Sequence, residues 1–252
     1  MKRVTLPPNL PPQTPAFKRF ERSAVALNRF YWTFRCSLTH TLSSLAPHTR
    51  IPELVPGEIG EHIDITCAQF RSEAPAAERM ARYTLLAMSV TVYEDYLREI
   101  TSQFLLKHWK QNSTYKVSFR PEELPSDATL TDFIRERAIK TRVEDLISKN
   151  YSSRIDSLCH LLTEFGVARP TVPADTQKYA TAACEARNCI IHSGGVVDER
   201  AREALSAFIP QLAKDSQLEC EQALLWHFLG ALRDSARIFD NAIRAKPNRT
   251  GT

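Results

Sequence analysis

Apolar side chains recur at intervals of three and four residues over most of this chain, which is the period of an amphipathic α-helix. Two long stretches show it best, Phe17–Leu45 and about Pro75–Trp109. Further helices are expected at Leu130–Ser148 and Ser153–Phe165, with a short one around Ile63–Phe70. The alternation of period two that would predict a β-strand does not stand out in any segment.

Polar residues at the ends of these stretches indicate where the later helices start and stop. Asp175 or Thr176 is expected to cap a helix that runs to about His192, and Asp198 to cap a short helix after it. The sequence Ser216-x-x-Glu219 has the form of a capping box that would open the last helix. The elements together predict an all-α protein, a bundle of long amphipathic helices with no significant sheet.

The pattern predicts one α-helical domain between two tails. The domain is expected at residues 17–246, and its N-terminal helix, 17–46, either adds to the bundle or pairs with a second subunit. Residues 1–16 are rich in proline and are expected to form a disordered leader, and residues 247–252 a flexible tail.

Composition narrows the classes of protein that need to be considered. The chain has 7 glycines in 252 residues, which suits long helices with few tight turns. Its 6 cysteines show neither Cys-x-x-Cys spacing nor a zinc-finger pattern, so they are interpreted as thiols in a reducing compartment. A signal peptide and a membrane span are not predicted, because no apolar stretch is long enough. We therefore expect a cytoplasmic protein.

Positive charge is concentrated near the start of the chain. The first 50 residues contain eight Lys or Arg and one acid, Glu21. Lys18, Arg22 and Arg29 share one face of the N-terminal helix, a pattern that suits phosphate contacts and is also found on solvated helix faces. An organelle transit peptide would be basic as well, but the prolines between Pro7 and Pro15 argue against one.

One short stretch carries the candidate chemistry. Arg187, Asn188 and His192 lie on the last turns of a predicted helix, and Gly194 and Gly195 follow. An arginine fork can hold a phosphodiester with two parallel hydrogen bonds, and histidine exchanges protons near neutral pH. RNA brings its own nucleophile, the 2′-hydroxyl, so cleavage needs a base, an acid and charge stabilisation but no metal.

This stretch resembles the Arg-x(4)-His motif of HEPN ribonucleases, in the form found in the RiboL-PSP HEPN branch. The resemblance covers about residues 60–245 and implies a HEPN-type helical bundle that works as a homodimer through its motif helices. It further implies that Arg187 stabilises charge on the scissile phosphate and that His192 acts as general base or acid. Asn188 would orient His192 or the phosphate, and the product would carry a 2′,3′-cyclic phosphate.

The expected function is therefore a metal-independent endoribonuclease without a cofactor, serving as a toxin or antiviral effector. HEPN toxins paired with a nucleotidyltransferase antitoxin have a tyrosine where this chain has Gly194, so any regulatory partner protein would work differently. The alternatives are a non-catalytic HEPN-like module that binds RNA or protein, and a helical scaffold in which His192 only caps its helix. The spacing alone is not specific, since Arg35 and His40 share it.

Other residues have secondary roles in this interpretation. Lys178 is a weak candidate for RNA contact, and a carboxylate that orients the site could come from Glu94 or Asp95. Core packing is the favoured role of Tyr93, Tyr96 and Tyr179, against base stacking. A nucleophilic cysteine at position 184 or 189 is the least favoured option.

Overall fold

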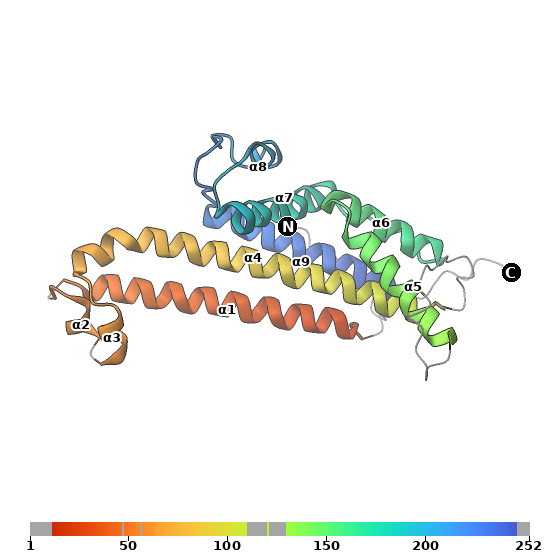
Figure 1. Cartoon of the computed structure of the whole chain (residues 1–252), viewed down its shortest axis with the longest axis horizontal. Coiled ribbons are helices and arrows are strands. Elements are labelled where there is room, and N and C mark those ends of the chain that lie inside the picture. Colours follow the sequence, from red (N-terminus) through yellow and green to blue (C-terminus); the bar gives the residue numbers. More distant parts are fainter. Residues whose placement is uncertain (1–11, 47, 56, 110–119, 121–129, 246–252) are drawn as a thin grey trace. The chain divides into compact units, whose positions relative to one another are not determined.

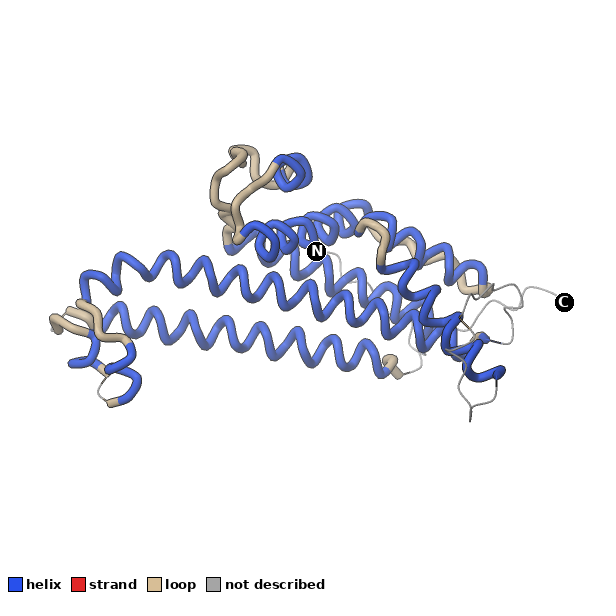
Figure 2. The backbone as a smooth tube through the Cα atoms, in the orientation of Figure 1, coloured by secondary structure: helices blue, strands red, loops and turns tan. Residues whose placement is uncertain are grey.

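The computed structural model describes residues 12–46, 48–55, 57–109, 120 and 130–245. Within these residues every regular element is an α-helix, and strand pairing is limited to isolated bridges (Figures 1 and 2). The prediction of an all-α fold is therefore confirmed. The helices are α1 (Pro15–Ser44), α2 (Ile51–Leu54), α3 (Glu58–His62), α4 (Cys67–Lys107), α5 (Leu130–Ile147), α6 (Tyr151–Glu164), α7 (Ala174–Ser193), α8 (Glu199–Leu205) and α9 (Gln222–Arg244).

The described helices belong to two compact units, and the long helices contribute to both. The first unit contains the start of α1 up to Arg22, the segment Val90–Cys184, and α9 from His227 onward. The second unit contains Ser23–Ser89 and Glu185–Trp226, so the end of α7 with the candidate motif belongs to it. The expected boundaries of a single domain stay a prediction.

Aromatic side chains form the centre of the first unit. Tyr96 packs edge-on against Phe17 with ring centroids 6.0 Å apart, and its hydroxyl donates to the carbonyl of Ala236 at 2.8 Å. The hydroxyl of Tyr93 shares a hydrogen bond of 2.7 Å with Ser235. Both tyrosines are buried, so the expectation that they pack in the core is confirmed.

A buried carboxylate holds the beginning of α1 in the same unit. Asp240 accepts hydrogen bonds from the backbone of Thr14 at 3.1 Å and from its hydroxyl at 2.6 Å. Arg244 donates to the other carboxylate oxygen at 2.9 Å. Because a buried charge needs such partners, the segment just before α1 is tied down, and the helix begins at Pro15.

In the second unit, α1 and α4 are joined by an ion pair and by a small apolar cluster at one end. Glu78 of α4 accepts from Arg35 of α1 and from Arg82 one turn further along α4. Beyond the end of α1, Leu45 packs with Ile51 and Cys67. The chain therefore reverses direction through α2 and α3 around a core of its own.

The start of α4 differs from its prediction. The helix begins at Cys67 and runs through Pro75, where a helix start was expected, and Ile63–Phe70 is not a separate helix. Thr66 explains the early start, since its hydroxyl accepts from the backbone of Gln69 at 3.2 Å while the Gln69 side chain accepts from the backbone of Thr66 at 2.9 Å. This reciprocal capping is a local signal that the periodicity did not reveal.

The predicted capping box at Ser216 is wrong. The Ser216 hydroxyl donates to the carbonyl of Ala213 at 2.6 Å, and α9 begins only at Gln222. Leu218, which would have lain in the first turn, is fully buried, and its N–H donates to the carbonyl of Gly195 at 2.8 Å. A tertiary contact therefore holds this segment in a non-helical path.

Most other helix ends agree with expectation. α5 and α6 end within a residue of the predicted positions, and Asp198 caps α8 by accepting from the N–H of Ala201 at 2.7 Å. α7 begins at Ala174, so Asp175 lies in its first turn and does not precede it. The predicted tail at 247–252 lies outside the described residues, as does most of the predicted leader, 1–16.

Candidate functional site

The candidate motif occupies the last turns of α7, in the second unit. Arg187 and Asn188 are half-buried, and Nη1 of Arg187 donates to Oδ1 of Asn188 at 3.2 Å. His192 and its neighbour Ile191 are exposed, Ile191 by 54 %. The end of the helix thus presents an imidazole to solvent and, one turn earlier, a guanidinium coupled to an amide.

Two glycines follow Ser193, the last residue of the helix and the neighbour of His192. Gly194 has φ +61° and Gly195 φ +84°, both in the left-handed region that glycine adopts without strain. The N–H of Gly195 donates to the carbonyl of Cys189 at 3.1 Å, which satisfies a helix-end carbonyl. One residue beyond His192 the chain therefore enters a left-handed turn, which ends the helix.

Side chains from two other segments hold this turn. The Tyr83 hydroxyl of α4 donates to the carbonyl of Leu218 at 2.6 Å and accepts from Nε2 of Gln217 at 2.9 Å. Gln217 also donates to the carbonyl of Gly194 at 3.0 Å. Burial raises the pKa of Tyr83, so the hydroxyl stays protonated and can donate. The sequence did not identify Tyr83 and Gln217 as residues that hold this turn. A glycine in a sequence can indicate that another group packs closely against the backbone, but it does not show which residue that is.

The acid nearest to the motif in sequence, Glu185, is engaged elsewhere. Glu185 is only 9 % exposed, and it accepts from Nη2 of Arg200 at 2.9 Å. Arg200 lies in α8, so this ion pair ties α8 to the body of α7. Burying a carboxylate requires a partner of this kind, which makes the pair structural.

The alternative of a nucleophilic cysteine receives no support. Burial raises the pKa of the Cys189 thiol, and its Sγ donates to the carbonyl of Val196 at 3.3 Å. A reactive cysteine needs the opposite shift, towards thiolate. Cys184 is buried as well, at 1 % exposure.

The remaining candidates lie in the first unit. Lys178 is exposed on α7, and its contact with RNA stays a prediction. Glu94 accepts from the Tyr151 hydroxyl at 2.6 Å and from Arg154 at 2.7 Å, while Asp95 is exposed. Tyr179 stacks on His227 with centroids 5.3 Å apart. These contacts account for Glu94 and Tyr179 as packing residues.

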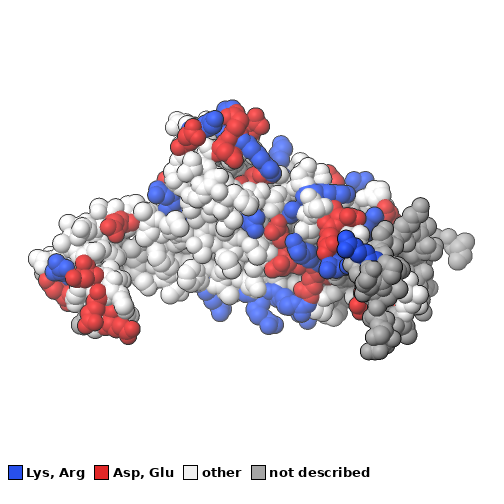
Figure 3. Space-filling view, viewed as in Figure 1, with Lys and Arg blue, Asp and Glu red and all other residues white. Residues whose placement is uncertain are grey.

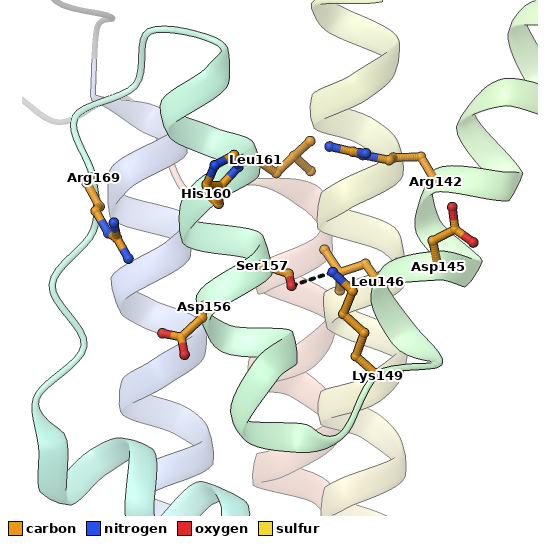
Figure 4. A pocket seen from close by; sticks show the side chains of 9 residues that line it. All are labelled: Arg142, Asp145, Leu146, Lys149, Asp156, Ser157, His160, Leu161 and Arg169. Atoms are coloured by element: carbon orange, nitrogen blue, oxygen red, sulfur yellow. Dashed lines mark hydrogen bonds between the residues drawn. The ribbon is translucent and has the colours of Figure 1, made fainter. Parts of the chain in front are cut away.

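A hollow between α5 and α6 of the first unit was not expected from sequence (Figure 4). Its volume is about 380 Å³, and Lys149 crosses it to donate to the Ser157 hydroxyl at 2.8 Å. Arg142 is already held by Glu164 at 3.0 Å. Acids alternate with the cations along the wall, so the charges select neither an anion nor a cation. The lining residues are Arg142, Asp145, Leu146, Lys149, Asp156, Ser157, His160, Leu161 and Arg169.

The fold and the motif together define an all-α protein with an exposed His about one helical turn after an Arg–Asn pair. Comparison of the chain with family models, with curated proteins and with solved structures finds no match. Among the described side chains, no group of three or more His, Cys, Asp or Glu could hold a metal ion. None of the described helices is long and apolar enough to cross a membrane.

Proposed function

We propose that this protein is a metal-independent endoribonuclease of the HEPN class, acting in the cytoplasm. The observation that carries the proposal is the exposed imidazole of His192 at the end of the helix that also bears the Arg187–Asn188 pair. These three side chains supply the groups that transesterification of RNA requires. A role as a toxin or antiviral effector follows from the resemblance of the motif alone.

In the proposed reaction the 2′-oxygen attacks the adjacent phosphorus while His192 removes the 2′-hydroxyl proton. The bond from phosphorus to the 5′-oxygen breaks, and the leaving oxygen takes a proton from His192 or from the same residue of a second copy. Arg187 donates to the phosphate oxygens as charge develops on them, and Asn188 keeps the guanidinium in place through its 3.2 Å hydrogen bond. The products are a 2′,3′-cyclic phosphate and a free 5′-hydroxyl.

A homodimer is part of the proposal, because one copy leaves His192 in water. Acid–base and electrostatic catalysis are weaker in high dielectric than in a closed site. A second motif helix laid over the first would exclude water and bring two Arg–His sets to one cleft, as in the HEPN arrangement. The specific activity should then rise with protein concentration through the dimerisation range.

The test is cleavage of a mixed RNA pool by purified protein in excess EDTA, followed by analysis of the product ends. We expect His192→Ala to lower the cleavage rate by about 10²–10⁴, the usual contribution of a placed acid or base. His62→Ala is the matched control, since His62 is also an exposed helix-end histidine of the second unit. Arg187→Ala should lower the rate as well, with Arg71→Ala of exposed α4 surface as its control.

The outcomes separate the enzyme from its alternative. Cyclic phosphate ends from the wild type and none from His192→Ala would establish the mechanism. Equal cutting by both would remove His192 from it. RNA binding by a dimer that cuts no RNA would favour the non-catalytic module, which keeps the fold and loses the chemistry.

A further inference from the structure

One stretch of α1 in the second unit carries no acid. Between Ser23 and Ser44 the helix contains neither Asp nor Glu, and its exposed positions include Arg29, Thr33 and His40. Figure 3 shows a group of acidic atoms at α2 and α3, beyond the end of this stretch. This part of α1 therefore presents an exposed arginine, Arg29, and hydrogen-bonding groups to solvent, without carboxylates of its own that would repel a polyanion.

The same stretch of α1 carries a partly exposed aromatic side chain, that of Trp32. Trp32 is 46 % exposed, yet its ring stacks on Trp226 with centroids 5.7 Å apart and planes 16° apart. Tyr31, fully buried, sets its ring edgewise against both at 5.7 Å. The orientation of Trp32 is thus fixed by two ring contacts while much of the indole stays accessible.

Arg29 lies beside this ring. Positions three apart are neighbours on a helix surface, so Arg29 and Trp32 share one exposed strip. Arg35, the other arginine of the stretch, is held by Glu78 and by Gln222 at 3.1 Å, whereas Arg29 makes no ion pair with any described residue. Proteins bind single-stranded nucleic acid with cations that attract the phosphates and with aromatic rings on which the bases stack. The exposed guanidinium of Arg29 and the exposed ring of Trp32 supply one group of each kind.

We propose that this strip binds single-stranded RNA, with a base stacked on the exposed part of Trp32 and Arg29 on a neighbouring phosphate. The choice of RNA as the polymer rests on the proposed nuclease function. RNA binding does not require RNA cleavage, so binding by the strip is tested by measuring affinity, separately from nuclease activity. Every base can stack on an aromatic ring, so this contact does not distinguish one base from another. The strip therefore contributes to affinity for RNA and not to sequence preference.

The experiment is fluorescence anisotropy of a labelled 2′-O-methyl oligonucleotide of about 12 residues with the full-length protein. This probe lacks the attacking hydroxyl, so it survives an active nuclease. Trp32→Ala should weaken binding by about 5- to 100-fold, the range for one base–aromatic stack. Trp32→Phe should restore most of it. Arg29→Gln should lower the slope of log affinity against log salt by about 0.7, the value for one phosphate contact.

Matched controls stand on the same helix and in the same unit. Phe30 is 57 % exposed on α1 but lies on a different side of the helix, so Phe30→Ala should leave the affinity unchanged. Arg71→Gln on α4 should leave the salt slope unchanged. Circular dichroism checks each fold, and if Trp32→Ala does not fold, Trp32→Phe and Arg29→Gln carry the test.

Equal affinity of the wild type and Trp32→Ala would overturn the proposal, as would equal losses in Trp32→Ala and Phe30→Ala. Loss of self-association in Trp32→Ala with unchanged RNA affinity would assign the strip to a protein interface and also overturn it. A protein that cuts no RNA but binds it through Trp32 would refute the nuclease and keep the strip. A protein that cuts RNA but binds it independently of Trp32 would refute the strip and keep the nuclease.

Discussion

Replacing Gly195 with alanine tests whether the turn after α7 requires glycine for two separate reasons. The first is its φ of +84°, where a Cβ costs about 1–2 kcal/mol. The second is space, because a Cβ at this position would lie 2.5 Å from Oη of Tyr83 and 2.6 Å from Nε2 of Gln217. Neither distance is tolerable, so Tyr83 and Gln217 would have to move.

The expected magnitude follows from the bonds that such a movement breaks. Tyr83 would lose its 2.6 Å hydrogen bond to Leu218, and Gln217 its 3.0 Å bond to Gly194. Each is worth about 1 kcal/mol, so with the backbone term Gly195→Ala should destabilise the protein by about 3–4 kcal/mol. Gly194 also has a positive φ of +61° but nothing within 4 Å of a Cβ, so Gly194→Ala should cost only about 1–2 kcal/mol.

Urea unfolding followed by circular dichroism measures both variants against the wild type. We expect Gly195→Ala to lose about 2 kcal/mol more than Gly194→Ala, the share of the broken hydrogen bonds. Equal losses would refute the close approach of Tyr83 and Gln217. No loss in either variant would refute the left-handed turn itself.

Three further predictions concern ionisable side chains outside the candidate site. Glu94→Gln should lower stability by about 1–3 kcal/mol, since it weakens charged hydrogen bonds, and leave the cleavage rate unchanged; a slower rate with intact folding would make Glu94 part of the site. Cys36 is the exposed thiol of the six, so Ellman's reagent should titrate one thiol in the folded protein and six after unfolding. Burial raises the pKa of Cys220 from 9.0 to about 12, so the unfolded state ionises first as the pH rises. Stability should fall between those pH values by up to about 1.4 kcal/mol per unit, and Cys220→Ala should show a shallower fall.

The helices were predictable because the signals that make them are local. Apolar periodicity revealed α1, α5 and α6 to within about two residues, since each buries one face. Capping was predicted correctly at Asp198 and missed at Thr66, although both are short patterns. The failure at Ser216 has another cause, because the burial of Leu218 against the glycine turn outweighs a sound local signal.

The candidate site was also predictable from sequence only in part. Arg187, Asn188 and His192 sit within six positions, so sequence alone places them at one helix end. The residues that hold that end do not share this property, since Tyr83 and Leu218 are 135 positions apart in the chain. No pattern in one sequence connects such partners, and only the folded chain shows why Gly195 must be glycine.

The surroundings of His192 distinguish it from the other candidate pair and from other helix histidines. Arg35 and His40 have the same spacing as Arg187 and His192, but Arg35 forms an ion pair with Glu78 and a hydrogen bond to Gln222. His62 and His160 each have a glutamate one turn away, at 3.9 and 3.0 Å, and a carboxylate there would repel a phosphate. One turn before His192 the chain has Asn188, coupled to a guanidinium. Spacing alone therefore does not separate the two pairs, and the proposed nuclease rests on the Arg187–Asn188 contact together with the exposure of His192.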